Sequence, residues 1–159
     1  MNVPFQMKRF ALLLTCLIAV IGCRDATKSS HAPAPVPPHG GTPVVVEAHK
    51  YNLELVRDGD AGLMQAYILD EDFHDFIRVP ESNFALIANF AGRTERVEFL
   101  RATNAMSPTP ADPSFQFEAR SEWLKTATNF DGSIPSITIK GQTFTNITFP
   151  FPKGTQHIH

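Results

Sequence analysis

From residue 39 onward, apolar and polar residues alternate with a period of two, and this pattern constrains the fold more than any other feature of the chain. In "YNLELV", Tyr51, Leu53 and Leu55 share one face, and the residues between them lie on the other. Turn signals such as "RDGDAG" and "AGRT" separate the alternating segments, so neighbouring segments are expected to form hairpins. Strands do not alternate with helices as they do in a parallel α/β sheet. The pattern therefore predicts an all-β antiparallel fold.

Three hairpins are expected, and they pair "YNLELV" with "LMQAYILD", "NFALIANF" with "RVEFLRAT", and the two halves of "ITIKGQTFTNITF". Further strands are predicted at "PVVVEAH", "FIRV" and "SFQFEAR". The segment "SEWLKTA" predicts a helix of about two turns with Ser121 as its N-cap, and its Trp123 and Leu124 are expected to plug one end of the core. The expected fold is a single antiparallel β-sandwich, Ig-like in architecture, with about eight strands and one short helix. A small barrel is the alternative.

The N-terminal segment has the layout of a secretory signal. "MKRFALLLTCLIAVIGC" places a basic pair before an apolar run and ends in small residues, and the run is shorter than the roughly 20 residues of a spanning helix. Its end, "VIGC" at 20–23, resembles the lipobox of bacterial lipoproteins, with Val20 where leucine is commonest. The resemblance implies cleavage after Gly22 and a lipid on Cys23. A secreted, unlipidated protein is the alternative, and translation starts at Met1 or Met7.

The chain divides into four predicted parts. Residues 1–22 are the signal peptide, 23–38 are the lipidated cysteine and a proline-rich tether, 39–153 are the β-domain, and 154–159 are a flexible histidine-containing tail. Arg24, and not aspartate, follows the cysteine. In lipoproteins of the Gram-negative kind this implies export to the outer membrane, so we expect a domain that is anchored by lipid there and faces the periplasm.

Composition excludes two classes of function. The two cysteines, Cys16 and Cys23, are assigned to the signal and to lipidation, so the mature chain is expected to have neither a disulfide nor a thiol nucleophile. With 14 basic and 16 acidic residues and no basic patch, the chain is not expected to bind nucleic acid.

Histidines and carboxylates gather near the first hairpin. His39 and His49 are separated by about 33 Å of extended chain, so they cannot share one metal ion on a continuous strand, and His39 is assigned to the turn before the strand. If the first hairpin turns between Asp58 and Ala61, the numbers of two paired residues sum to 119 or 120. This register places His49 opposite Asp70 or Glu71, at the start of "DEDFHD". The sequence thus predicts a weak zinc or copper site. Its ligands would be His49, Asp70, Asp72 and His74, with His39 or the C-terminal tail assisting; a solvated acidic loop is the alternative.

The C-terminus contains two further candidate features. His157 and His159 lie on one side of an extended chain, which suits weak copper or nickel binding, although a tail tolerates histidine without any function. Phe149 and Phe151 of "FPFPKG" are predicted on one face of an edge strand. Such an edge can accept a partner strand, but its prolines favour the interpretation that they block pairing.

No catalytic template is present. The chain has neither a G-x-S-x-G elbow nor a phosphate-binding loop, and Asp70 and Asp72 are loop neighbours and not an opposed acid–base pair. We therefore expect no enzyme activity, with a hydrolase as a third hypothesis that requires a cleft.

The stretch "PHGG…VVV…H…YNLELV…LMQAYILD" and the final "WLKTATNFDGSIPSITIKGQTFTNITFPFPKG" resemble small bacterial envelope proteins found near the adaptors of heavy-metal efflux systems. The resemblance implies a periplasm-facing β-domain linked to metals. The chain has no fusion hairpin or biotinyl-like segment, so an efflux subunit in its own right is not expected. The expected function is an anchored binding module for a transition metal. The alternative is a structural lipoprotein that binds another envelope protein and no metal.

Overall fold

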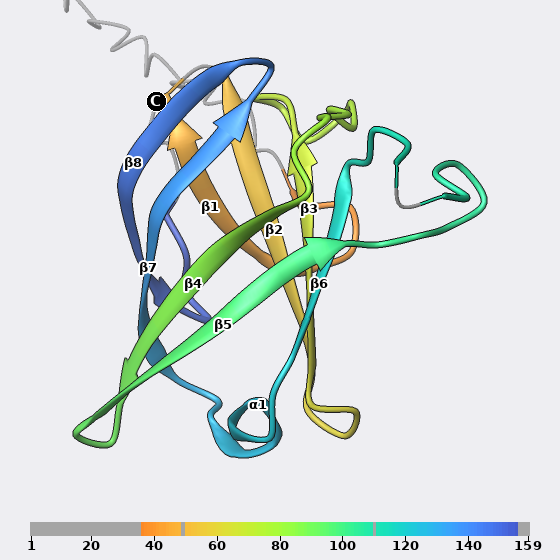
Figure 1. The fold of residues 1–159 in the computed structure, drawn as a ribbon. Coiled ribbons are helices and arrows are strands. Elements are labelled where there is room, and N and C mark those ends of the chain that lie inside the picture. The colour runs from red at the N-terminus through yellow and green to blue at the C-terminus, as the bar shows by residue number, and fades with distance from the viewer. Residues whose placement is uncertain (1–35, 49, 110, 156–159) are drawn as a thin grey trace, which may run out of the picture. The chain divides into compact units, whose positions relative to one another are not determined.

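The structure is a computed structural model, and it describes residues 36–48, 50–109 and 111–155. These residues form an all-β domain with one very short helix, as the alternation predicts (Figure 1). The elements in chain order are β1 (Thr42–Glu47), β2 (Tyr51–Asp58), β3 (Leu63–Leu69), β4 (Asn83–Phe90), β5 (Arg93–Arg101), β6 (Gln116–Arg120), α1 (Trp123–Thr126), β7 (Phe130–Ile139) and β8 (Gln142–Phe151).

All eight strands belong to one antiparallel sheet in the order β1-β2-β3-β6-β5-β4-β7-β8. Within it, β7 returns to lie beside β4 of the β4-β5-β6 meander, which is a Greek-key connection. The outermost strands, β1 and β8, approach each other through the residues that follow β8. Thr155 donates its N–H to the Pro43 carbonyl at 2.8 Å, and its Oγ1 accepts the Val45 N–H at 2.7 Å. The sheet is therefore nearly closed around a main core, and a smaller cluster of Tyr67, Leu69 and Phe115 is separate from it. The contacts of Thr155 extend past residue 153, the predicted end of the domain.

The three predicted hairpins are present as β2–β3, β4–β5 and β7–β8. The last two have two-residue turns, Ala91-Gly92 and Lys140-Gly141, in which both residues have positive φ. Such turns match the right-handed twist of the flanking strands. The predicted register of the first hairpin is wrong, because the observed partners have numbers that sum to 121, as in Glu54 with Tyr67. The last pair before the turn is Asp58 with Leu63. The observed sum of 121 exceeds the predicted sums of 119 and 120, so each residue of β2 faces a partner one or two positions later than predicted.

The core is rich in phenylalanine, and Trp123 and Leu124 close one end of it as expected. Their helix is a single turn, shorter than predicted. Ser121 is not its N-cap: the cap is Glu122, which makes no side-chain capping bond, and Ser121 instead accepts the Leu124 N–H with its backbone carbonyl.

Two other expectations are corrected. "FIRV" does not form a strand, because Phe76 and Val79 make only isolated bridges, to Leu69 and Ser114. Phe149 and Phe151 do share one face of β8, but that face is turned to the core and both side chains are buried. They are therefore not surface aromatics. Within the described ranges, no helix combines the length and the hydropathy needed to cross a bilayer.

Candidate functional site

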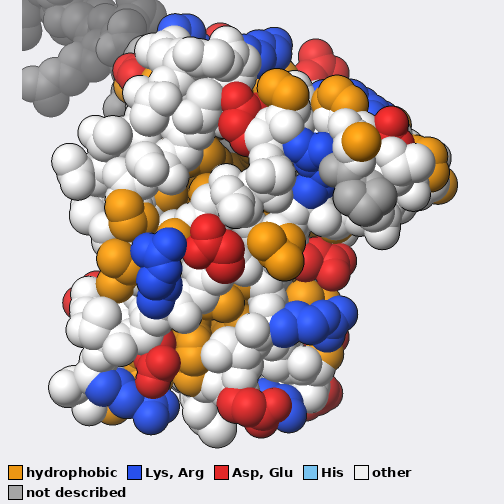
Figure 2. Space-filling model, viewed as in Figure 1, with side chains coloured by type: hydrophobic (Ala, Val, Ile, Leu, Met, Phe, Trp, Pro, Cys, Tyr) orange, Lys and Arg blue, Asp and Glu red, His pale blue; other side chains and the backbone are white. Residues whose placement is uncertain are grey.

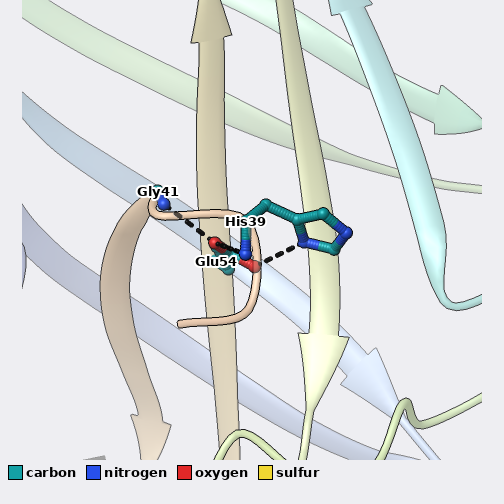
Figure 3. Close-up of polar contacts among 3 residues, drawn as sticks. All are labelled: His39, Gly41 and Glu54. Atoms are coloured by element: carbon teal, nitrogen blue, oxygen red, sulfur yellow. Dashed lines mark hydrogen bonds and ion pairs between the residues drawn. The ribbon is translucent and has the colours of Figure 1, made fainter. Parts of the chain in front are cut away.

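Glu54 is a fully buried carboxylate on the outer face of the sheet. It lies in β2 between Leu53 and Leu55, whose side chains face the core, so the Glu54 side chain projects to the opposite side. Its relative exposure is nevertheless 0%. The segment before β1 crosses the sheet at this point and covers it, as Figure 3 shows.

Three donors of the covering segment surround the carboxylate. Glu54 Oε1 accepts the backbone N–H groups of His39 and Gly41, each at 2.8 Å, and His39 Nδ1 lies 2.8 Å from Oε2 (Figure 3). Such charge-assisted bonds compensate for the removal of the carboxylate from water. They also attach the segment that follows the predicted tether to the middle of a strand.

The local sequence "HGG" explains why the chain can bind in this way. Gly40 has a φ of +67°, a conformation that glycine adopts without strain. At Gly41 a Cβ atom would lie 2.7 Å from the Leu55 carbonyl oxygen, so a larger residue would push the chain off β2. His39 thus lies in a turn before the first strand, as predicted, and its partner is Glu54.

An aromatic cluster covers the same face. The His39 ring stacks on Tyr67 with centroids 4.0 Å apart, and Phe76 lies against His39 and against Phe115. The guanidinium of Arg78 lies over the Phe115 ring. Burial raises the pKa of the Tyr67 phenol above its usual 10.0, and the carboxylates of Glu54 and Glu118 raise it further.

The acidic loop after β3 contains three of the predicted metal ligands. Asp70 Oδ1 accepts the backbone N–H groups of His74 and Asp75, and Asn52 Nδ2 donates to the carbonyls of Asp70 and Glu71. Asp70 is half-buried, while Asp72 and His74 are exposed. One Asp70 oxygen therefore shapes the loop, and the Asn52 amide fixes the loop to β2.

Four of the predicted site residues, Cys23, His49, His157 and His159, lie outside the described residues. Within the described part, no three histidine, cysteine or acidic side chains are grouped in a way that would hold a metal ion. The site that combines His49 with Asp70, Asp72 and His74 stays a prediction. At the base of this loop, Asn52 Oδ1 is buried without a hydrogen-bond partner.

A third region is an open seam between β4 and β7. The two strands pair only from Ile87–Asn89 to Asp131–Ser133 in the described part of the chain. If the register continued, Pro135 would lie opposite Ala85, but proline has no N–H to donate and disrupts a ladder. Pro135 is also skipped in the pairing of β7 with β8, where Asn146 has a φ of +57°. Beyond Ser133 the strands separate, as Figure 1 shows.

Sequence reasoning missed both Glu54 and the seam. A glutamate between two leucines of an alternating strand indicates a solvated side chain. The only contrary signal is the pair of glycines in "HGG", which allows the backbone before β1 to approach Glu54 closely. The seam had a visible signal, since Pro135 lies two residues before the predicted segment "ITIKGQTFTNITF" and a proline argues against pairing on one side. No family model matches this chain, and comparisons with curated proteins and with solved structures find no match either.

Proposed function

We propose that this chain is a lipid-anchored lipoprotein of the bacterial envelope whose β-domain is a protein-binding module without catalytic activity. The signal-like segment and "VIGC" support the anchor. The open seam supports the binding role and is the observation that carries it, because a strand edge with unpaired backbone groups favours pairing with another chain. The hydrogen bonds of Glu54 with His39 and Gly41, which we call the Glu54 cradle, support the tethered arrangement. They fix the point where the predicted tether meets the domain.

The anchor is tested by labelling cells with a palmitate analogue and fractionating their membranes. We expect labelled protein in the outer-membrane fraction, and we expect Cys23→Ser to lose both the label and the membrane association. A wild-type protein that carries no lipid would contradict the anchor.

The binding role is tested by photocrosslinking in cells. A photoreactive residue at Ser136, which is exposed beside the seam, is expected to capture one partner protein, whereas the same residue at exposed Asp60 is not. Additional probes at exposed positions of the other strands show whether a partner binds elsewhere. If no probe on the domain captures a protein, the proposed role is wrong.

Weak binding of a transition metal is a second candidate. It is favoured by the buried acceptor Asn52 Oδ1 at the base of a loop that contains Asp70, Asp72 and His74. Isothermal titration with zinc and with copper tests this function. We expect wild-type protein to give measurable heats of metal binding. The double variant His49→Ala with His74→Ala should lose these heats, and the tail variant His157→Ala with His159→Ala should retain them. Heats that the first variant leaves unchanged would eliminate the site.

A further inference from the structure

We propose that the seam between β4 and β7 binds an extended segment of a partner protein, which pairs with the free edge of β4 and directs a lysine or arginine side chain to Glu81. This inference rests on the proposed function and specifies its site and the chemistry of its partner.

The backbone of the seam leaves one side of β4 available for pairing. From Asn83 to Leu86, β4 is paired with β5 on one side, and no β7 partner lies on the other among the described residues. Alternate residues of a strand direct their N–H and C=O groups to each side, so half of those in this stretch face the seam. An extended polypeptide satisfies such a row of donors and acceptors, as in β-strand addition.

The seam is also hollow. It contains a cavity of about 220 Å³ lined by residues of both strands, with the buried side chains of Phe84 and Ile137 among them. Figure 2 shows hydrophobic side chains inside a hollow between β7 and β4. The exposed surface of this lining is mostly polar, so the inward-pointing alternate side chains of an inserted strand would contact polar groups beside Phe84 and Ile137.

The charges of the seam favour a basic side chain on the partner. One carboxylate oxygen of Glu81, Oε2, is buried and has no hydrogen-bond partner, and Glu81 lines the cavity. The two other charged residues of the lining, Arg96 and Glu98, are paired with each other at 3.0 Å. A buried acceptor without a donor is costly, and a lysine or arginine of the partner would supply the donor.

The proposal is tested by selecting peptides of about 12 residues, long enough for one strand, from a random phage library on the purified lipoprotein in detergent. We expect selected peptides that are enriched in lysine and arginine. Bound peptide should slow amide hydrogen exchange in Asn83–Leu86. Glu81→Gln should weaken binding by about tenfold, the effect expected of one charge-assisted bond. Glu122→Gln, at the exposed carboxylate of the N-cap residue of α1, should change affinity less than about twofold.

A second pair of variants blocks the seam without relying on Glu81. Ser136→Trp places a large side chain beside the seam and is expected to abolish peptide binding, while Thr145→Trp, at the exposed cross-strand neighbour on β8, is expected to preserve it. Selected peptides without basic residues, peptides that protect another segment, or the absence of any binding peptide would overturn the inference. Cellular crosslinks from other faces would then still support a protein-binding role, whereas the absence of crosslinks from every probe would overturn that role as well.

Discussion

At the scale of single residues, Glu54 shows how burial can contradict a local pattern. Its position in β2 is that of a solvated side chain, but the segment before β1 removes it completely from water. The cost of that burial is offset by three donors from His39 and Gly41. A polar residue on an outer face is thus part of the stabilising structure.

Glu54→Gln is expected to lower the free energy of unfolding by about 1–3 kcal/mol, because the amide cannot accept all three bonds and offers donors where donors already lie. Urea denaturation followed by circular dichroism measures the loss. Glu47→Gln, at an exposed carboxylate of β1, is the matched control and should have little effect. A Glu54→Gln protein as stable as wild type would show that the cradle does not stabilise the fold.

Gly41→Ala is expected to destabilise the protein by about 1–3 kcal/mol, the usual range for overpacking, because the new methyl group would approach the rigid Leu55 carbonyl. Asp60→Ala is the control, since Asp60 is exposed in the turn of the first hairpin and this change adds no atom against backbone. Thermal unfolding of both variants checks the difference. Equal midpoints would mean that the segment over β2 can move away without cost.

Tyr67 is expected to ionise above pH 10, and folding stability should fall as pH rises through this range. Because burial and Glu54 raise the pKa in the folded state, the folded protein retains a proton that the unfolded chain has lost. Tyr51→Phe leaves Tyr67 as the sole tyrosine, so absorbance titration follows it directly. Adding Glu54→Gln should lower the midpoint. A midpoint that does not respond to this change would exclude the carboxylate as a cause.

At the scale of elements, turn chemistry and proline determine where strands pair. The Ala91-Gly92 and Lys140-Gly141 turns fix two hairpins locally. Pro135 has the opposite effect, because it ends the pairing of β4 with β7 after three residue pairs. The short helix depends on packing instead: without a side-chain cap, its position follows from the burial of Trp123 and Leu124.

Closure of the sheet is expected to depend on Thr155. Thr155→Ala removes the Oγ1 acceptor of the Val45 N–H and should cost about 1 kcal/mol. Thr155→Ser keeps the hydroxyl and should retain most of the stability. Hydrogen exchange at the Val45 amide is the direct readout, and it should accelerate in the alanine variant alone. Exchange that is unchanged in Thr155→Ala would show that β1 is held by β2 without this contact.

At the scale of the whole molecule, one main core and no disulfide are expected to give a single cooperative unfolding transition. Cys16 and Cys23 are the only cysteines, and both precede the described domain. A reducing agent should therefore leave the unfolding midpoint unchanged, and fluorescence of Trp123 and far-ultraviolet circular dichroism should report the same transition. Two separate transitions, or a midpoint lowered by reductant, would contradict this expectation.

Local patterns predicted most of the elements because strand alternation and turn residues act over a few positions. The three hairpins, the burial of Trp123 and Leu124, and the turn at His39 followed in this way. The register of the first hairpin did not, because the exact turn closure between Asp58 and Leu63 differs from the predicted one by about one residue. The candidate metal residues stay a prediction, since His49 lies outside the described residues.

The sequence by itself determined the all-β class, the hairpins and the positions at which backbone must bend, because each depends on neighbouring residues. Only the tertiary structure decided that Glu54 is buried beneath His39, that Phe149 and Phe151 face the core, and that β4 and β7 separate into an open seam. These features depend on contacts between residues far apart in the chain. Such contacts are set by how the whole sheet closes, and no local period encodes them.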